Sequence, residues 1–256
     1  MTLRAVVKGV GHYLPERIVP NAEFEKTLDT TDEWIKSRSG IERRHFAAEG
    51  ETTSMLATKA AQAALTNAGM TADDVDAIVL ATSTADLTFP SAATMVQANL
   101  GMTKGFAFDI QAVCAGFVFA LSNANALILS GQAKRVLVIG AETFSRIMDW
   151  TDRGTCVLFG DGAGALILEA EEGAGDNGDR GILSTDLNSD GTHRDLLYVD
   201  GGVSTGTSGY LRMQGNQVFR HAVGKLAATA TTAMERANVT TDDVDWIVPH
   251  QANIRI

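Results

Sequence analysis

Cysteine and proline are both scarce in this 256-residue chain, and each shortage excludes a class of protein. Two cysteines, Cys114 and Cys156, cannot form a disulfide framework, so a reducing cytoplasm is the expected compartment. Only four prolines and a hydrophobic fraction of 45% indicate an ordered globular protein. No apolar run approaches the roughly 18 residues that cross a bilayer, and the N-terminus lacks a secretory pattern. We therefore expect no membrane association.

Positive charge is also in deficit. The chain has 21 Lys and Arg against 31 Asp and Glu, a formal net charge of −10. This balance argues against nucleic-acid binding, which needs a basic surface, and any anionic partner would have to meet locally clustered arginines. Metal-ligand spacings such as Cys-x-x-Cys are absent from the sequence, so we expect no metal. The glycine-rich "GDGAGAL" is followed by a strand pattern, which disfavours a nucleotide-binding loop.

The segments that are present alternate between strand and helix patterns, which is typical of an α/β fold. Buried strands are short, β-branched and bounded by turns, and alanine-rich helices lie between them. From Glu171 to His193 the chain becomes polar and glycine-rich, so we place a boundary there, between halves 1–170 and 171–256. The predicted elements, in chain order, are strands "AVVKGV" and "DAIVLATST", with helix 53–68 between them, then strand "GFAFDI", helix 114–130, and strands "KRVLVIGAET" and "AGALILEA".

One acidic segment occurs twice. "TADDVDAIV" at 71–79 returns as "TTDDVDWIV" at 240–248, with seven of nine positions identical. Each copy follows an alanine-rich helix and precedes a strand pattern, which favours two related halves over a chance match of short acidic turns. The first half continues well beyond its copy, whereas the second stops at Ile256. We therefore expect a truncated second half, shorter by on the order of 60 to 90 residues.

Cys114 stands where a strand pattern ends and a long apolar helix pattern begins. Apolar residues occur on nearly every face of helix 114–130, which predicts a central, buried helix. A cysteine in the first turn of a helix faces free backbone N–H groups and the positive end of the dipole, which lower its pKa and can receive an oxyanion. The alternative is a small buried hydrophobic residue. For Cys156, which has no helix start beside it, we favour that alternative.

A nucleophilic thiol needs a proton acceptor, and of five histidines His250 is the best placed. It ends the strand pattern "DWIVPH", and reacting groups of α/β sheets gather at strand ends. Asn253 is close enough in sequence to orient the imidazole or a substrate carbonyl.

Taken together, these residues identify a family resemblance. The chain resembles β-ketoacyl-acyl carrier protein synthase III, the initiating condensing enzyme of type II fatty-acid synthesis, within the thiolase-like superfamily. The resemblance covers essentially the whole chain and implies a duplicated five-layered αβαβα fold, in agreement with the internal repeat. It rests on "GVGHYLPERIVPNAEFEKTLDTTDEWIKSRSGIERRH", "FPSAATMVQANLG", "AFDIQAVCAGF", "TDRGTCVLFGDGAGA", "MQGNQVF" and "VPHQANIRI".

The resemblance implies a role for each matching residue. Cys114 would carry a short acyl group, most simply acetyl, taken from coenzyme A. His250 would promote decarboxylation of malonyl-acyl carrier protein, and the resulting carbanion would attack the acyl-cysteine to give 3-oxoacyl-acyl carrier protein. Trp34 and Arg153 would enclose the adenine of coenzyme A. The other implied positions are Thr30, Arg38, Gly215, Asn216, Phe219 and Asn253 for coenzyme A and pantetheine, Phe89 for the acyl pocket across a homodimer interface, and Gln251, Ala252, Asn253, Ile254 and Arg255 for carrier-protein docking. No cofactor beyond acyl-coenzyme A is implied.

The resemblance breaks off at the C-terminal end. Family members continue to an Asn-bearing loop and a glycine-rich oxyanion segment, and neither follows "HQANIRI" in this sequence. A chain that physically ends at Ile256 is therefore expected to be inactive. Two alternatives remain open. One is a related enzyme that uses an acyl-cysteine, such as a secondary-metabolite starter synthase or 3-hydroxy-3-methylglutaryl-coenzyme A synthase. The other is a non-catalytic protein that binds acyl groups or the carrier.

Overall fold

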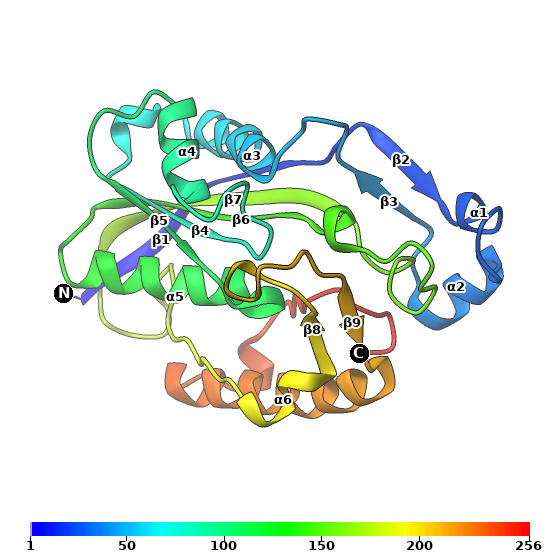
Figure 1. The fold of residues 1–256 in the computed structure, drawn as a ribbon. Coiled ribbons are helices and arrows are strands. Elements are labelled where there is room, and N and C mark those ends of the chain that lie inside the picture. The colour runs from blue at the N-terminus through cyan, green and yellow to red at the C-terminus, as the bar shows by residue number, and fades with distance from the viewer. Residues whose placement is uncertain (1) are drawn as a thin grey trace.

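A computed structural model describes residues 2–256. Nine strands and six helices are assigned in this part of the chain (Figure 1). The strands are β1 (Thr2–Tyr13), β2 (Arg17–Pro20), β3 (Arg43–Phe46), β4 (Ala77–Ala81), β5 (Phe106–Ile110), β6 (Arg135–Thr143), β7 (Asp161–Gly173), β8 (Leu197–Val199) and β9 (Leu211–Met213). The helices are α1 (Asn21–Phe24), α2 (Asp32–Ser39), α3 (Thr53–Ala68), α4 (Ala92–Asn99), α5 (Gly116–Leu129) and α6 (Gly215–Ala237).

The central sheet has the strand order β1-β7-β6-β4-β5. Strand β4 runs parallel to both β5 and β6, whereas β7 is antiparallel to β6 and β1. In this register Ala81 of β4 lies opposite Ile110 of β5 and Gly140 of β6. The carboxyl ends of three neighbouring strands therefore meet at one edge, which is where α/β proteins gather their reactive groups.

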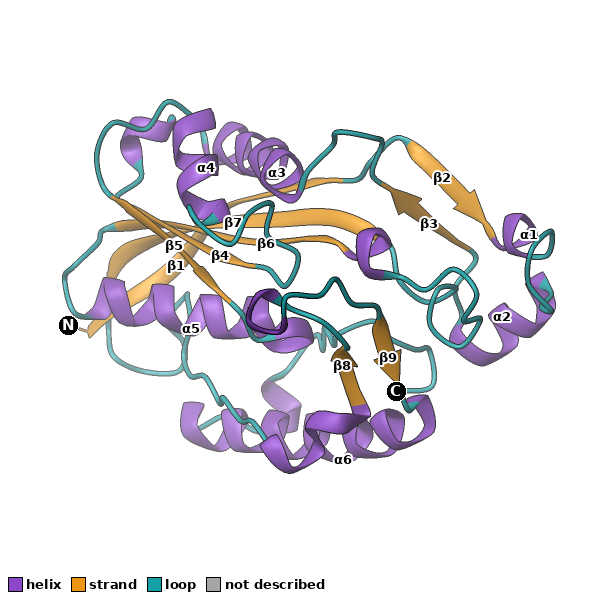
Figure 2. Cartoon of the chain, viewed as in Figure 1, coloured by secondary structure: helices purple, strands orange, loops and turns teal. Residues whose placement is uncertain are grey.

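Helices cover both faces of this sheet. Helices α3 and α4 pack on one face and α5 packs on the other, as the cartoon shows (Figure 2). The resulting layers confirm the predicted α/β class. Strand β7 continues to Gly173, so the predicted boundary at 170/171 falls just inside its last residues.

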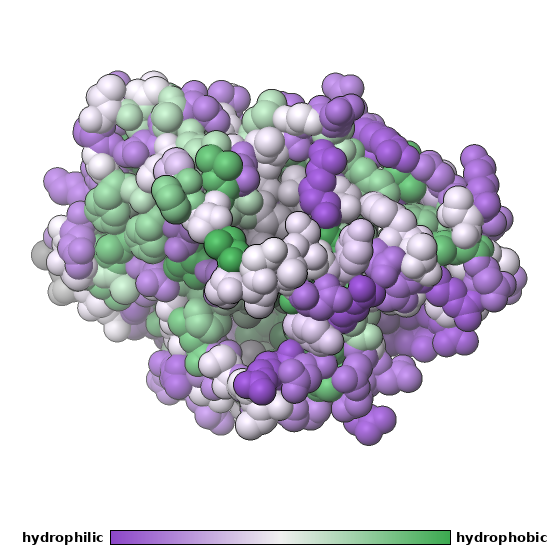
Figure 3. Space-filling view, in the orientation of Figure 1, coloured by the Kyte–Doolittle hydropathy of each residue, from purple (hydrophilic) through white to green (hydrophobic). Residues whose placement is uncertain are grey.

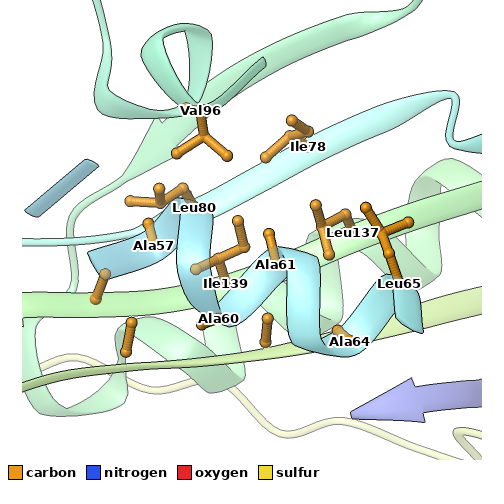
Figure 4. Packing of buried hydrophobic residues seen from close by; sticks show 14 of the residues in the cluster. Ala57, Ala60, Ala61, Ala64, Leu65, Ile78, Leu80, Val96, Leu137 and Ile139 are labelled. Atoms are coloured by element: carbon orange, nitrogen blue, oxygen red, sulfur yellow. The ribbon is translucent and has the colours of Figure 1, made fainter. Parts of the chain in front are cut away.

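The core between α3 and the sheet is built largely from alanine against branched side chains. Ala57, Ala60, Ala61 and Ala64 point from α3 toward Ile78, Leu80, Leu137 and Ile139 (Figure 4). Small side chains let the helix backbone approach β1 closely: a Cβ on Gly11 would lie 2.2 Å from the backbone nitrogen of Ala64. Helix α3 spans the predicted residues 53–68 and ends at Gly69 in the left-handed conformation, as its sequence indicated.

The repeated acidic segment has the same local structure in both places. In each copy a threonine, Thr71 or Thr240, begins a short 3₁₀ turn and forms a capping box with the aspartate three residues on. The backbone N–H and the hydroxyl of each threonine both donate to that aspartate at 2.8 Å. The match supports the inferred relationship between the two halves.

The strand expected after the second copy is wrong. The first copy leads into β4, but residues 244–250 form no strand, and Trp246 and Val248 are each 85% exposed. A strand needs a neighbour to satisfy its backbone groups and bury its side chains. Within residues 2–256 this segment has neither, so an apolar strand pattern remains an extended surface segment.

Helix α5 is less buried than expected. Its buried residues, Gly116, Ala120, Ala124 and Ile128, recur every four positions and form a single stripe against the sheet. Val118 and Leu129 on other faces are 46% and 51% exposed. Figure 3 shows that this side of the molecule is hollowed between the α5 layer and the layer that contains α6. The prediction of a helix buried on nearly every face is therefore wrong, because within residues 2–256 only the sheet packs closely against α5.

No helix in residues 2–256 combines the length and apolar character needed to cross a membrane.

Candidate active site

Cys114 lies in a short 3₁₀ turn, Val113–Ala115, immediately before α5 rather than in the first turn of that helix. Val113 has a φ of +48°, in the left-handed region that β-branched residues rarely adopt. Backbone strain of this kind persists where surrounding structure imposes it, often at functional sites. Here the strained residue precedes an exposed cysteine, whereas Cys156 is fully buried.

The turn that contains Cys114 sits on the carboxyl ends of the parallel strands. A Cβ added to Gly116 would lie 3.2 Å from the Cβ of Ala81 at the end of β4. A Cβ added to Gly140 of β6 would lie 3.3 Å from the ring of Phe117. The start of α5 is thus pressed against β4 and β6, and the thiol is held beside this edge of the sheet.

The predicted lowering of the Cys114 pKa is wrong for this structure. Burial raises the pKa of the thiol, and the carboxylate of Glu142 acts in the same direction, while a backbone N–H bond lowers it. The residue reaches solvent, but the protein around the sulfur is dense enough for desolvation to be the largest effect. The sulfur is therefore held mainly as a neutral thiol.

Glu142, near the end of β6, is a residue that sequence reasoning missed. Its carboxylate accepts hydrogen bonds from the backbone N–H of Ser83 at 2.8 Å, from the hydroxyl of Thr84 at 2.5 Å and from that of Thr82 at 3.4 Å. Burial raises the pKa of Glu142, while these donors lower it. The signal in the sequence was an acidic residue at the end of an otherwise apolar strand pattern.

His250 is exposed and lies in the extended segment after the second acidic repeat. Desolvation nevertheless lowers the pKa of the imidazole, which favours the neutral form. Within residues 2–256 no hydrogen bond joins His250 to Cys114. In this part of the chain, the two predicted catalytic residues are therefore not in hydrogen-bond contact.

Trp34 contacts Arg153, which the resemblance pairs with it around the adenine, and also Arg38, which the resemblance assigns to phosphate. The guanidinium carbons of Arg38 and Arg153 lie 4.8 and 5.2 Å from its ring centroid. Ile35, not Trp34, is the α2 residue turned into the core, where it is 1% exposed, and Trp34 lies half-buried at the rim. The alternative of a tryptophan that only fills the core is therefore disfavoured.

Thr30 lies beside this aromatic–arginine cluster. Its hydroxyl oxygen is buried and has no hydrogen-bond partner within residues 2–256. A buried hydroxyl usually finds a partner, so an unpaired one beside this cluster calls for an explanation. Asp29, the preceding residue, accepts from Arg153 through its backbone oxygen and its carboxylate.

The C-terminal residues pack against the end of α2. Asn253 donates to the backbone oxygen of Arg38 at 2.9 Å, and Arg255 donates to that of Ser37 at 2.7 Å. Ile254 donates its N–H to Ser39 at 3.0 Å. The predicted carrier-docking segment and the predicted coenzyme A mouth thus adjoin each other.

The remaining predicted residues are mostly exposed. Gly215 and Asn216 are exposed in the first turn of α6, and Phe219 follows half-buried one turn later. Phe89 is 82% exposed in the segment between β4 and α4. Gln251 and Ala252 are exposed. Residues 2–256 contain no cluster of three or more His, Cys, Asp or Glu side chains placed to hold a metal ion.

Comparison with known proteins identifies the family of this chain. A family model described as 3-oxoacyl-[acyl-carrier-protein (ACP)] synthase III matches residues 108–191, which include Cys114. The β-ketoacyl-[acyl-carrier-protein] synthase III of Roseobacter denitrificans is 83% identical over 256 residues, which are 100% of this chain and 79% of that protein. The chain belongs to the β-ketoacyl-acyl carrier protein synthase III family. As a member of it, the protein is an acyltransferase, the initiating condensing enzyme.

Solved structures of synthases III agree with the fold. The enzyme of Aquifex aeolicus has a TM-score of 0.90 at 43% identity, over 98% of this chain and 78% of the other. The enzyme of Pseudomonas aeruginosa has a TM-score of 0.91 at 41% identity, over 98% and 77%. Neither the related acyl-cysteine enzymes nor a non-catalytic binding protein is favoured by these matches.

Proposed function

We propose that Cys114 is the nucleophile that carries the acyl group of this condensing enzyme. The observation that carries the proposal is the exposed thiol on a strained turn, held at the carboxyl ends of three parallel strands. The sulfur attacks the carbonyl of a short acyl-coenzyme A such as acetyl-coenzyme A. A new C–S bond forms, the bond to coenzyme A breaks, and the thiol proton leaves with the coenzyme A sulfur.

In the second stage, His250 assists the malonyl group on the carrier protein. Loss of carbon dioxide leaves a carbanion that attacks the acyl-cysteine carbonyl, which releases Cys114 and gives 3-oxoacyl-acyl carrier protein. The lowered pKa of His250 supports this role, because a neutral imidazole can donate a hydrogen bond to the malonyl thioester oxygen as negative charge develops there. Alternate use of one thiol by two substrates is expected to give ping-pong kinetics.

The cluster around Trp34 is proposed as the coenzyme A mouth. An indole with two guanidinium groups over it suits a purine ring, and the arginines also suit phosphate. The unpartnered hydroxyl of Thr30 offers one more polar contact. Gly215, Asn216, Phe219 and Asn253 belong to the same proposal as pantetheine contacts.

The partners follow from the neighbouring surfaces. Residues 251–255 adjoin the mouth, and Arg255 supplies positive charge that an acidic carrier protein would meet. The exposed ring of Phe89 supports insertion into a second copy of the chain, in a homodimer. We further propose that the enzyme acts in the cytoplasm and needs no cofactor beyond its substrate acyl-coenzyme A. We also propose that the chain divides into two related halves, 1–170 and 171–256.

The test is malonyl-dependent turnover. The complete natural protein, purified and supplied with acetyl-coenzyme A and malonyl-acyl carrier protein, should release carbon dioxide and form 3-oxoacyl-acyl carrier protein, and Cys114→Ala should abolish the condensed product. Cys156→Ala is the matched control, because that thiol is fully buried and should leave product formation intact. Equal product from Cys114→Ala and the parent chain would overturn the proposal.

A further inference from the structure

A carboxylate with no cationic partner is buried beside the nucleophile. Glu142 accepts hydrogen bonds only from neutral donors, those of Thr82, Ser83 and Thr84. It takes part in none of the ion pairs of residues 2–256. Burying a carboxylate without a cation is costly, so a residue of this kind calls for a functional explanation.

The hydrogen bonds of Glu142 attach one short segment to the edge of the sheet. Residues 82–84 follow β4, and the backbone N–H of Thr82 also donates to Ile110 at the end of β5 at 3.1 Å. The hydroxyl of Thr84 accepts from the backbone N–H of Thr143 at 2.8 Å. Glu142 thus holds the segment against the strand ends on which the turn of Cys114 rests.

Three other carboxylates on adjoining elements are occupied elsewhere, and the first of them, Asp109 of β5, accepts from the backbone N–H groups of Ala92 and Ala93 at 2.7 Å. Asp86, beyond the 82–84 segment, accepts from the N–H of Ser54 at 2.8 Å and from its hydroxyl at 2.6 Å. Asp161 of β7 accepts from the N–H and hydroxyl of Ser145 at 2.8 and 2.6 Å. Glu142 is the charged group that acts on the Cys114 thiol.

We propose that Glu142 is a positioning residue that controls when Cys114 ionises. Its hydrogen bonds fix the 82–84 segment against the strand ends on which the turn of Cys114 rests, and its negative charge adds to desolvation in keeping the resting sulfur a thiol. The inference rests on the proposed role of Cys114. A resting thiol reacts slowly with oxidants and adventitious electrophiles, because the thiolate is the reactive form. Ionisation is thereby confined to the encounter with an acyl thioester, whose departing sulfur takes the proton.

The test measures the pH dependence of Cys114 alkylation by iodoacetamide in the complete chain. Glu142→Gln keeps the acceptor for Ser83 but removes the charge, so the midpoint should fall and more thiolate should be present at a given pH below it. Glu142→Asp keeps the charge and should leave the midpoint close to that of the parent. Cys156 serves as an internal control because it is fully buried.

A second neutral variant guards against a folding defect. Glu142→Met also removes the charge, and replacing a buried charge by an apolar side chain is often tolerated or stabilising. Circular dichroism identifies which neutral variants fold, and any folded one should show the lower midpoint. A profile that coincides with the parent in folded Glu142→Gln or Glu142→Met overturns the inference.

Acetyl loading separates this inference from the function on which it rests. If acetyl-coenzyme A acylates Cys114 in the parent chain but the neutral variants show no shift, only the role of Glu142 fails. If the parent chain forms no acyl-cysteine at all, the proposed function itself fails.

Discussion

Arg153 lies over the ring of Trp34, with its guanidinium carbon 5.2 Å from the indole centroid. A flat ring between them would need two contact layers of about 3.5 Å each, roughly 7 Å in all. Arg153 is also held by Asp29. An adenine can therefore enter between them only if Arg153 moves away from Trp34.

Arg153→Ala and Trp34→Ala should each weaken recognition of the adenine. Cation–π and stacking contacts of about 1 kcal/mol or more correspond to a roughly fivefold to tenfold rise in KM for acetyl-coenzyme A. The kcat should change little, because these residues lie away from the reacting atoms. Steady-state kinetics with acetyl-pantetheine, which lacks the adenine, provides the control. An equal loss with both substrates would show that the cluster does not bind the purine.

Arg44 is expected to contribute strongly to the stability of the folded protein. It is 5% exposed, and its guanidinium donates to Val19 O at 3.1 Å, Asn21 Oδ1 at 2.8 Å and Val157 O at 2.5 Å. Arg44→Met should lower the free energy of unfolding by about 3 kcal/mol, because three buried acceptors lose their donor.

Urea unfolding measures this loss. Arg43→Met on the same strand is the matched control, since Arg43 is exposed and should cost little. Similar losses for the two variants would contradict the structural role assigned to Arg44.

Arg212 links the two predicted halves through a pH-dependent ion pair. It bonds Asp149 at 2.8 Å and Asp200 at 2.7 Å, and the pKa of Asp149 is lowered to about 2, first by its hydrogen bond from the Thr151 hydroxyl and then by that from Arg212. Because this pKa is below the unfolded value of about 3.9, the pair stabilises the fold fully above about pH 5. That contribution is lost as pH falls toward 2.

Thermal unfolding of the parent and Arg212→Gln across this range tests the prediction. The difference in Tm should be constant near neutral pH and should shrink in acid. A difference that persists unchanged at pH 2 would assign the effect of Arg212 to packing instead of charge.

The strain at Val113 predicts a trade-off between stability and activity. A left-handed non-glycine residue costs about 1–2 kcal/mol, whereas glycine in the same place costs about 0.5–1 kcal/mol of chain entropy. Val113→Gly should therefore leave the Tm unchanged or slightly raised. Acyl transfer to Cys114 should slow, because the turn that presents the sulfur becomes less rigid. A large fall in Tm, or faster loading, would show that the strained turn has no such role.

Local patterns in the sequence were sufficient for much of the fold. Helix α3 and its end at Gly69 follow from alanine content and a C-terminal glycine, and both acidic repeats form the same capped turn because Thr and Asp bond within four residues. The strand expected in "DWIVPH" (245–250) is absent because strand formation depends on partners elsewhere in the fold, not on the apolar pattern alone.

Local sequence patterns predicted less of the candidate site than of the fold. Cys114 could be selected by its place before an apolar helix, but its pKa depends on Glu142, which parallel pairing of β4 and β6 brings alongside. The contact of Trp34 with Arg153 is likewise a product of tertiary folding, and only the family resemblance anticipated it. The packing of Asn253 on α2 had no local signal at all.

The most direct test of the central claim is to locate the acyl group. The protein is incubated with acetyl-coenzyme A, its intact mass is recorded, and the modified peptide is sequenced by mass spectrometry, with Cys114→Ala and Cys156→Ala treated in parallel. The account predicts one acetyl group, carried on Cys114, present in the parent and in Cys156→Ala and absent from Cys114→Ala. An acetyl group on any other residue, or none on a folded parent chain, would contradict it.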